Sequence, residues 1–443
     1  MNQSLFSSHA VNNESRKEKV YCTDTKVYIL PFGQSPDVRF SRYLANREKQ
    51  RTMAPDRASM TKWTLLLVSS LTIMSIITIS PVLPQMTKAF SDQPHAAFLV
   101  RLILTIPALF IAATAPIAGK LIDRFGRLKL LTGALLLYTV AGSAGIYLQN
   151  IYAFLVARAL LGVAVGISMT IVVTLVADYY SGAERQRFVG IQIAFMSIGG
   201  ILFLTLSGFL ADVGWRYPFL LYLLALVILP LTWRFLYEPE AIKTIRQGPS
   251  RQVKAPAFIF ILFVNTLLMW IAFFLVPVQI PFHLVSLGVG RNALIGMALA
   301  TSTASSAISS YWYHRIKGQR SFSSVYFIGY GLMGIGFTCL ALTATYPLAV
   351  LSLFFIGMGI GAMMPNTNMW VMLLAPPEIR GQEIGKLTMF WFLGQFLSPF
   401  VAQPLIRPFG ISGIFGLAGL LLFLLALLFL SLHFLPKVRQ FDH

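Results

Sequence analysis

Charged residues are scarce in this 443-residue chain. Asp, Glu, Lys and Arg make up 12% of the residues, whereas 56% are hydrophobic. Ordinary soluble domains carry roughly 25% charged residues. A chain with so few charges cannot cover its own apolar surface with polar groups, which excludes a water-soluble globular protein. The composition predicts an integral membrane protein whose main partner is the lipid bilayer.

Cysteine and clustered metal ligands are also scarce. The two cysteines fall in the polar N-terminal segment (Cys22) and in an apolar segment (Cys339), so they do not predict a structural disulfide. The six histidines are scattered, and no metal-ligand spacing, phosphate-binding glycine loop or nucleophile motif occurs. We therefore expect no enzyme, no catalytic residue, no cofactor and no metal.

Acids are outnumbered by bases, 16 to 35, which gives a net charge of +19. In a soluble protein this excess would suggest nucleic acid as a partner, but the positions of the charges exclude it here. Every acid lies in the N-terminal segment, in a loop or at the end of an apolar segment, whereas Arg101 and Arg158 fall inside apolar segments. The sequence predicts an electropositive cavity with no carboxylate near mid-membrane.

Twelve apolar segments follow Trp63, most of them long enough to cross roughly 30 Å of hydrocarbon at about 20 residues each. Their lengths suit helices rather than barrel strands, and helices satisfy their own backbone hydrogen bonds. The expected spans are residues 63–87, 96–118, 129–148, 151–178, 186–211, 217–237, 256–280, 291–312, 322–343, 347–374, 381–405 and 411–435.

The Lys and Arg residues of the connecting segments set the orientation. If the N-terminus is cytoplasmic, 17 of those beyond the N-terminal segment fall on the cytoplasmic side and four on the other side, namely Lys88, Arg216, Arg291 and Arg407. The positive-inside rule then predicts that both termini are cytoplasmic.

Polar stretches divide the chain. Residues 1–60 are polar without an apolar stripe and are expected to be a disordered tail. Residues 61–237 and 256–436 are expected to form two six-helix bundles, joined by a cytoplasmic linker at 238–255 and followed by a cytoplasmic tail at 437–443.

The two bundles are expected to be repeats. A shift of 195 residues superposes an arginine and four glycines of one half on those of the other: Gly162 on Gly357, Gly166 on Gly361, Arg185 on Arg380, Gly190 on Gly385 and Gly199 on Gly394. Small residues at such spacings also occur in generic helix-packing seams. The shared arginine favours duplication, and the fold class expected is an all-α polytopic membrane protein of two six-helix repeats.

One charged loop separates the second and third spans. Gly119, Asp123, Arg124, Gly126 and Arg127 stand in the order Gly-x-x-x-Asp-Arg-x-Gly-Arg, and Lys129 adds a further charge. A loop that only sets topology would explain the basic residues but neither the acid nor the glycines. The pattern resembles the loop between the second and third helices of the major facilitator superfamily.

This resemblance implies the major facilitator fold and the movement of a small solute by alternating access. It also implies that the five loop residues control gating, together with Asp178 at the end of the fourth span. Arg380 directly precedes the eleventh span, whose positive N-terminal end would face Asp123.

Polar and aromatic residues inside the spans are the candidates for the substrate cavity, because polar groups cost free energy in lipid and should face water or each other. The candidates are Arg158, Gln192, Asn265, Trp270, Asn366, Asn368, Trp391 and Gln395. The tryptophans are equally compatible with an aromatic cavity wall and with helix packing. Arg158 is expected to face the cavity and to bind a carboxylate or phosphate with its two-pronged guanidinium.

Arg158 also opens the sequence Arg-x-x-x-Gly-x-x-x-Gly with Gly162 and Gly166, similar to the fourth helix of the drug:proton antiporters of the family, although Leu161 replaces their glutamine. The resemblance implies a monomer in a bacterial inner membrane that exports a drug-like or amphiphilic compound with protons as coupling ion. Two alternatives stay open: a carrier of an organic anion, such as a carboxylate metabolite or siderophore, and a transporter-like sensor or scaffold.

Overall fold

The computed structural model describes residues 18–23, 26–31, 55–239, 255–377 and 379–434. Within them, eleven helical stretches are long and apolar enough to cross a membrane, and the last of them, Arg380–Leu432, has 53 residues. The helices are α2 (Pro55–Ile77), α3 (Leu83–Ala89), α4 (Ala96–Phe125), α5 (Arg127–Gly142), α6 (Ile151–Tyr179), α7 (Gly182–Val213), α8 (Leu224–Phe235), α9 (Phe258–Ser286), α10 (Asn292–Tyr311), α11 (Tyr313–Lys317), α12 (Phe322–Ala341), α13 (Tyr346–Leu374) and α14 (Arg380–Phe434), with short 3₁₀ helices at η1 (Ser80–Val82), η2 (Ser143–Ile146) and η3 (Tyr217–Leu223).

Helix α14 contains two spans rather than one. At about 1.5 Å per residue, 53 helical residues are more than twice the thickness of the hydrocarbon. Its only non-helical residue is Gly410, whose φ of 68° and ψ of 178° break the helix, and glycine adopts a positive φ at little cost. The twelve expected spans are therefore confirmed, with the turn between the last two at Gly410.

Two features of the fold differ from the expectation. Two antiparallel strands, β1 (Glu18–Thr23) and β2 (Lys26–Pro31), pair from Glu18 with Pro31 to Thr23 with Lys26, within the segment expected to lack structure. Helix α4 continues through the charged loop to Phe125, seven residues beyond the expected end of the span. Most of the expected tail, linker and C-terminal tail lies outside the described residues.

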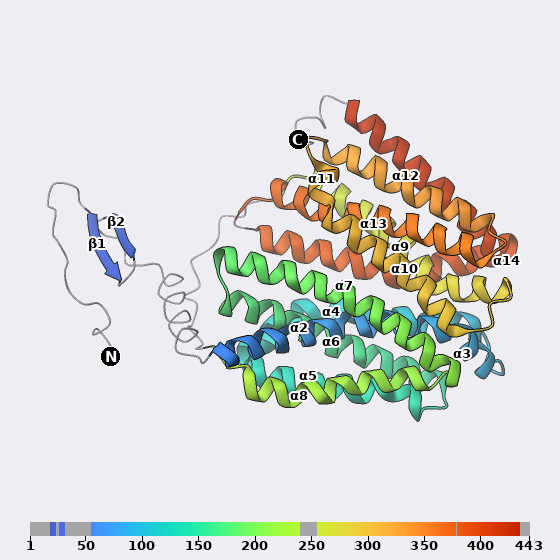
Figure 1. Cartoon of the computed structure of the whole chain (residues 1–443), viewed down its shortest axis with the longest axis horizontal. Helices are drawn as coiled ribbons and strands as arrows, with labels where there is room; N and C mark the ends of the chain where they lie inside the picture. The colour runs from blue at the N-terminus through green and yellow to red at the C-terminus, as the bar shows by residue number, and fades with distance from the viewer. Residues whose placement is uncertain (1–17, 24–25, 32–54, 240–254, 378, 435–443) are drawn as a thin grey trace.

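The helices form two groups of six spans (Figure 1). In the first group α4 packs along α6, and in the second the corresponding helices α10 and α13 pack together. A Cβ on Gly162 of α6 would lie 2.5 Å from the Pro107 carbonyl oxygen of α4, and one on Gly357 of α13 would collide with the Ser302 backbone of α10. The matched glycines Gly162 and Gly357 thus permit the same close helix contact in both halves.

The two halves meet at the end of the molecule away from the Gly119–Lys129 loop. We call this end the sealed face, and the end with the loop the loop face. At the sealed face the Asn292 backbone N–H donates to Asp212 Oδ1 over 2.6 Å, and the Ser80 hydroxyl donates to the Pro277 carbonyl over 2.5 Å. A Cβ on Gly208 would lie 2.7 Å from the Asn292 carbonyl oxygen, so the backbones of α7 and α10 are in direct contact.

Contact between the halves weakens along α7 towards the loop face. A Cβ on Gly208 would clash with α10, one on Gly200 would lie 3.2 Å from Thr303 Cγ2, and one on Gly190 would meet nothing within 4 Å. Among the described residues, no hydrogen bond or ion pair joins the halves at the loop face. The structure therefore has the sealed face closed and the halves apart at the loop face.

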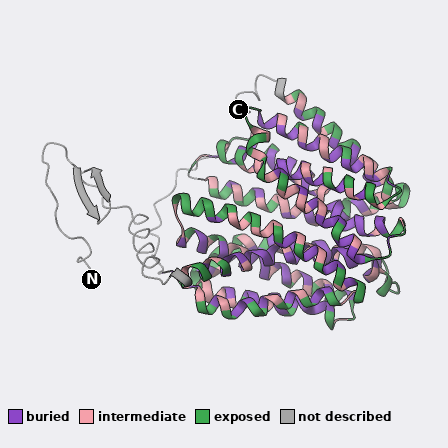
Figure 2. Cartoon of the chain, in the orientation of Figure 1, coloured by how far each residue is buried: buried purple, intermediate pink, exposed green. Residues whose placement is uncertain are grey.

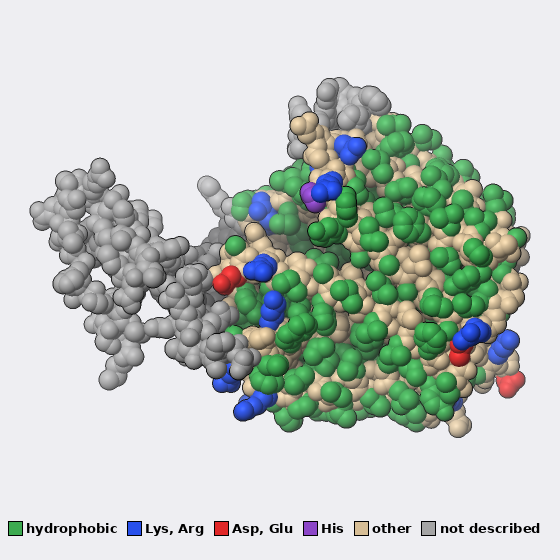
Figure 3. Space-filling model, viewed as in Figure 1, with side chains coloured by type: hydrophobic (Ala, Val, Ile, Leu, Met, Phe, Trp, Pro, Cys, Tyr) green, Lys and Arg blue, Asp and Glu red, His purple; other side chains and the backbone are tan. Residues whose placement is uncertain are grey.

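The surface fits a bilayer. Hydrophobic side chains cover the middle of the molecule, while Lys and Arg gather at its two ends (Figure 3). Each helix alternates between buried residues and exposed ones along its length (Figure 2). The exposed residues of the middle zone include large aliphatic and aromatic side chains on α8 and the second half of α14, such as Val227 and Leu427. These exposed apolar side chains are suited to contact with the hydrocarbon chains of lipid.

The close approach of α6 to α4 leads to a stability prediction. In Gly162→Ala, the new methyl group would lie 2.5 Å from the Pro107 carbonyl oxygen and 2.8 Å from Phe110 Cβ. Such overpacking costs about 1–3 kcal/mol, so the midpoint of thermal unfolding in detergent, followed by size-exclusion chromatography, should fall. In the control Gly190→Ala the methyl group meets open space, and the midpoint should stay or rise. Equal midpoints in the two variants would contradict the tight packing.

Candidate functional site

The charged loop folds against two other segments of its own half. Arg127 forms ion pairs with two acids: its Nη2 lies 2.8 Å from Asp178 Oδ2 at the end of α6, and its Nη1 lies 3.6 Å from Glu238 Oε1 just after α8. The Glu238 carboxylate also accepts the backbone N–H groups of Arg127 and Leu128, each over 2.8 Å. These N–H groups begin α5, where a helix has unpaired donors and partial positive charge.

Gly126 makes this arrangement possible. Its φ of 81° ends α4 and starts α5, and a Cβ there would lie 3.4 Å from Glu238 Oε1.

Two tyrosines lie beside this turn. Tyr179 and Tyr237 stack with ring centroids 4.3 Å apart, and the Tyr237 backbone N–H donates to the Tyr179 hydroxyl over 3.0 Å. Burial, with the Asp178 carboxylate as a second cause, raises the pKa of Tyr237 to about 12, so this phenol stays neutral at physiological pH.

The other predicted gating residues are not brought together. Gly119, Asp123 and Arg124 are exposed, and Asp123 has no ion pair within the described part of the chain. The Arg124 guanidinium lies 5.2 Å from the ring of the adjacent Phe125, and Arg380 donates to the Ala375 carbonyl over 3.4 Å. The expected contact between Asp123 and the start of α14 is absent here, because the halves are apart at the loop face.

Arg158 does not face an open cavity, contrary to the expectation. It is 1% exposed and donates from Nη1 to the Tyr222 hydroxyl over 2.9 Å. Its guanidinium carbon lies 4.9 Å from the Tyr222 ring centroid, 5.3 Å from that of Phe219 and 5.7 Å from that of Phe154. Aromatic faces attract a desolvated cation, so this cage inside the first half stabilises the charge without a carboxylate.

Several predicted cavity amides also bond within their own half. Asn265 accepts from the Tyr330 hydroxyl over 2.7 Å, and Asn366 donates to the Phe322 carbonyl and accepts from Tyr313, both over 3.1 Å. Asn368 donates to the carbonyl of Met364 on its own helix. The contacts of Asn265 and Asn366 join neighbouring helices, whereas that of Asn368 stays within α13.

Gln192 lies between α7 and α2, where it donates to the Ser69 hydroxyl over 2.8 Å. It is half-buried on a stretch of α7 that is otherwise largely exposed. Gln192 therefore joins two helices of the first half and stays partly exposed.

Three predicted cavity residues do come together, on α9 and α14. The rings of Trp270 and Trp391 are tilted by 36° with centroids 6.0 Å apart, and Gln395 follows Trp391 by one turn. Gly394 allows this contact, because a Cβ there would lie 2.7 Å from Trp270 Cβ. The three side chains form the candidate substrate surface.

The sequence alone did not identify two polar contacts near the site. At the sealed face, Arg101 donates from Nε to Gln279 Oε1 over 3.1 Å and lies 4.1 Å from the Phe282 ring centroid. At the loop face, Glu238 caps α5. The position of Arg101 inside a span indicates that it needs a polar partner. The sequence does not identify that partner, because Gln279 is 178 residues away. Glu238 looked like an ordinary linker acid.

Two six-helix repeats that meet around a central surface define a secondary transporter, a multi-pass membrane protein that moves a small solute by alternating access. The sequence matches the family profile of the Major Facilitator Superfamily over residues 65–324 and 320–440. The chain belongs to this family, as the charged loop indicated, and it is a transporter and not an enzyme.

Individual relatives differ in what their names say they carry. The chain is 27% identical over 344 residues to the "Bacillibactin exporter" of Bacillus subtilis (strain 168), which spans 72% of this chain and 83% of that exporter. It is 33% identical over 147 residues to the "Gallate transporter" of Pseudomonas putida, which spans a third of each protein.

Solved structures agree with the fold. The crystal structure of a D-xylose-proton symporter superposes with a TM-score of 0.70 at 17% identity and covers 86% of this chain and 98% of the symporter. At this identity the likeness concerns the architecture alone.

The Glu238 cap leads to a second prediction. Glu238→Ala leaves the first N–H groups of α5 without their acceptor, and the loss of a cap costs about 0.5–2 kcal/mol. The start of α5 should open more often, so trypsin should cleave after Arg124 and Arg127 several times faster than in the wild type.

The matched control is Glu184→Ala, which removes an exposed acid from the first turn of α7 at the same face. Its cleavage rate should equal that of the wild type. A Glu238→Ala protein that is as resistant as this control would refute the capping role.

Proposed function

We propose that the protein is a proton-coupled exporter of a drug-like or amphiphilic compound in a bacterial inner membrane. The loop face carries the excess of Lys and Arg, so the positive-inside rule assigns it to the cytoplasm together with both termini. The protein acts as a monomer without nucleic acid.

The separation of the halves at the loop face carries this proposal. Gly190 and Gly385, near the loop-face ends of α7 and α14, have open space around them, whereas Gly208 and Gly296 at the sealed face are in backbone contact across the two halves. A compound in the cytoplasm or inner leaflet therefore reaches the surface between the halves first. The similarity to an exporter over 72% of this chain supports the outward direction.

An organic anion is the second candidate for the substrate. Arg101 and Arg158 are buried in the spans, and no carboxylate among the described residues lies beside them. The positive potential of two buried guanidinium groups favours an anion over a cation. The names of the bacillibactin and gallate relatives support this candidate.

Counterflow in proteoliposomes with a mixed panel of labelled cations, anions and neutral amphiphiles tests the proposal. Counterflow measures exchange without requiring knowledge of the coupling ion. Exchange of amphiphiles irrespective of charge supports drug-like efflux, and exchange confined to anions supports the second candidate. A protein that exchanges no compound of the panel would contradict both.

Asp123 gives a prediction for gating. When the loop face closes, this carboxylate would meet the positive N-terminal end of α14, a contact of about 0.3–1 kcal/mol when exposed and about 2 kcal/mol when partly buried. Asp123→Asn should destabilise the closed loop face and reduce transport several-fold at normal expression. Asp92→Asn, an exposed acid at the sealed face, is the control. Transport at the wild-type rate in Asp123→Asn would remove Asp123 from the gate.

Glu383 gives a prediction for proton coupling. It is 3% exposed on the first turn of α14 and accepts from Lys386 over 2.8 Å, whereas Asp178 is held by Arg127 and Asp123 faces solvent. Among these three acids only Glu383 is buried, and its ion-pair partner is a lysine on its own helix. Glu383→Gln should keep counterflow but lose export driven by a pH gradient.

The comparison requires both assays on the same liposomes, with Glu184→Gln as the exposed control acid. Loss of counterflow as well in Glu383→Gln would mean that Glu383 holds the fold rather than the proton. Unchanged gradient-driven export would assign coupling to another group.

A further inference from the structure

Three polar atoms on the candidate substrate surface are buried without a partner among the described residues. They are Trp270 Nε1, Trp391 Nε1 and Gln395 Oε1. Trp270 is 8% exposed and Gln395 4% exposed. A buried donor or acceptor that is left unpaired costs free energy, so three of them side by side need an explanation.

The atoms lie close enough to act on one molecule. Trp391 and Gln395 are one helical turn apart on α14, and the Trp270 ring of α9 lies 6.0 Å from the Trp391 ring. Phe273 and Phe274 contact Trp270 with ring centroids 5.6 Å and 6.2 Å away, so the polar atoms lie on an aromatic surface.

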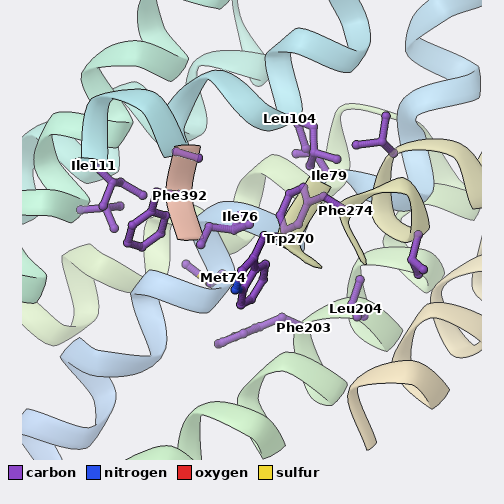
Figure 4. Packing of buried hydrophobic residues seen from close by; sticks show 14 of the residues in the cluster. Met74, Ile76, Ile79, Leu104, Ile111, Phe203, Leu204, Trp270, Phe274 and Phe392 are labelled. Carbon is purple, nitrogen blue, oxygen red and sulfur yellow. The ribbon is translucent and has the colours of Figure 1, made fainter. Parts of the chain in front are cut away.

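This surface faces the other half of the transporter. Figure 4 shows Trp270 beside Met74 and Ile76 of α2, with Phe203 of α7 on its other side. Helices α2 and α7 belong to the first half and α9 to the second. The unpaired atoms therefore lie where the halves separate and rejoin during transport.

The chemistry of the three atoms restricts the ligand. An indole N–H only donates, so the two tryptophans call for acceptor oxygens. The amide oxygen of Gln395 only accepts, so it calls for a hydroxyl or N–H group on the ligand. A hydroxyl group both accepts and donates, and an aromatic ring stacks on the tryptophans.

We propose that Trp270, Trp391 and Gln395 form a binding subsite for a hydroxylated aromatic ring of the substrate. The hydroxyl oxygens attached to this ring accept from the indole N–H groups, and one of the hydroxyl groups donates to Gln395 Oε1. This inference rests on the proposed function, because it identifies part of the compound that the transporter exports.

Three small probes of similar shape separate the contacts. Catechol carries two hydroxyl groups, its dimethyl ether veratrole keeps the oxygen acceptors but has no donor, and o-xylene has neither. Equilibrium dialysis against the protein in nanodiscs, with each probe radiolabelled, gives the three affinities. Each neutral hydrogen bond is worth about a two- to tenfold change in affinity, so catechol should bind more tightly than veratrole, and veratrole more tightly than o-xylene.

Conservative variants assign each contact. Trp270→Phe and Trp391→Phe keep an aromatic ring but remove the N–H, so each should reduce the preference for veratrole over o-xylene about two- to tenfold. Gln395→Met keeps the length of the side chain but removes the acceptor, so it should abolish the preference for catechol over veratrole. The control is Trp233→Phe, because Trp233 is 63% exposed and its N–H already donates to Thr132. This control should keep both preferences.

The outcomes separate the subsite from the proposed function. If the wild type binds the three probes equally, or if the variants keep both preferences, the subsite is refuted while counterflow of other compounds can still demonstrate transport. If the preferences appear as expected but no compound of the panel is exchanged, the subsite stands and the proposed transport function fails.

Discussion

Hydrocarbon cannot form hydrogen bonds, and this constraint governs every polar group in the spans. Most serine and threonine hydroxyls of the spans donate to a carbonyl three or four residues earlier on the same helix, as Ser69 and Thr78 do. Larger polar groups require tertiary partners: Asn265 Oδ1 accepts from Tyr330 and Arg158 Nη1 donates to Tyr222, whereas Asn265 Nδ2 and Arg158 Nε and Nη2 have no partner among the described residues. Polar groups left without a partner are therefore informative, and those on the tryptophan surface lie between the halves.

The arrangement of the spans could be predicted from the sequence because it depends on length, hydropathy and glycine. A helix needs about 20 apolar residues to cross the bilayer whatever its neighbours are. Gly162 and Gly357 reveal the repeat because only glycine permits the backbone contact that each makes. The turn between the last two spans falls between the expected bounds 381–405 and 411–435, at Gly410. The β1–β2 hairpin was not, since the polar composition of that segment favoured disorder.

The candidate site could be predicted only in part, because sequence shows which residues are polar but not what they meet. Arg158 looked unpaired because no acid lies at mid-membrane. Its partners are aromatic, and Phe219 and Tyr222 come from a span about 60 residues further along the chain. Glu238 similarly reaches the start of α5 across more than a hundred residues. In contrast, Trp391 and Gln395 are one turn apart on one helix, so their proximity follows from the sequence spacing alone.

Alternating access requires that the two closed faces have similar free energies, and the contacts suggest how this is achieved. The sealed face is held across the halves by hydrogen bonds such as Ser80 to Pro277 and Asn292 to Asp212, each worth about 0.5–1.5 kcal/mol, or somewhat more where a charge takes part. At the loop face the ion pairs of Arg127 with Asp178 and of Lys386 with Glu383 each lie within one half and therefore do not oppose the separation of the halves. A ligand shifts such an equilibrium only by its difference in affinity for the two states. A few hydrogen bonds between a ligand and the buried indole and amide groups have free energies similar to those of the contacts across the sealed face. Such bonds are therefore strong enough to shift the equilibrium between the two states.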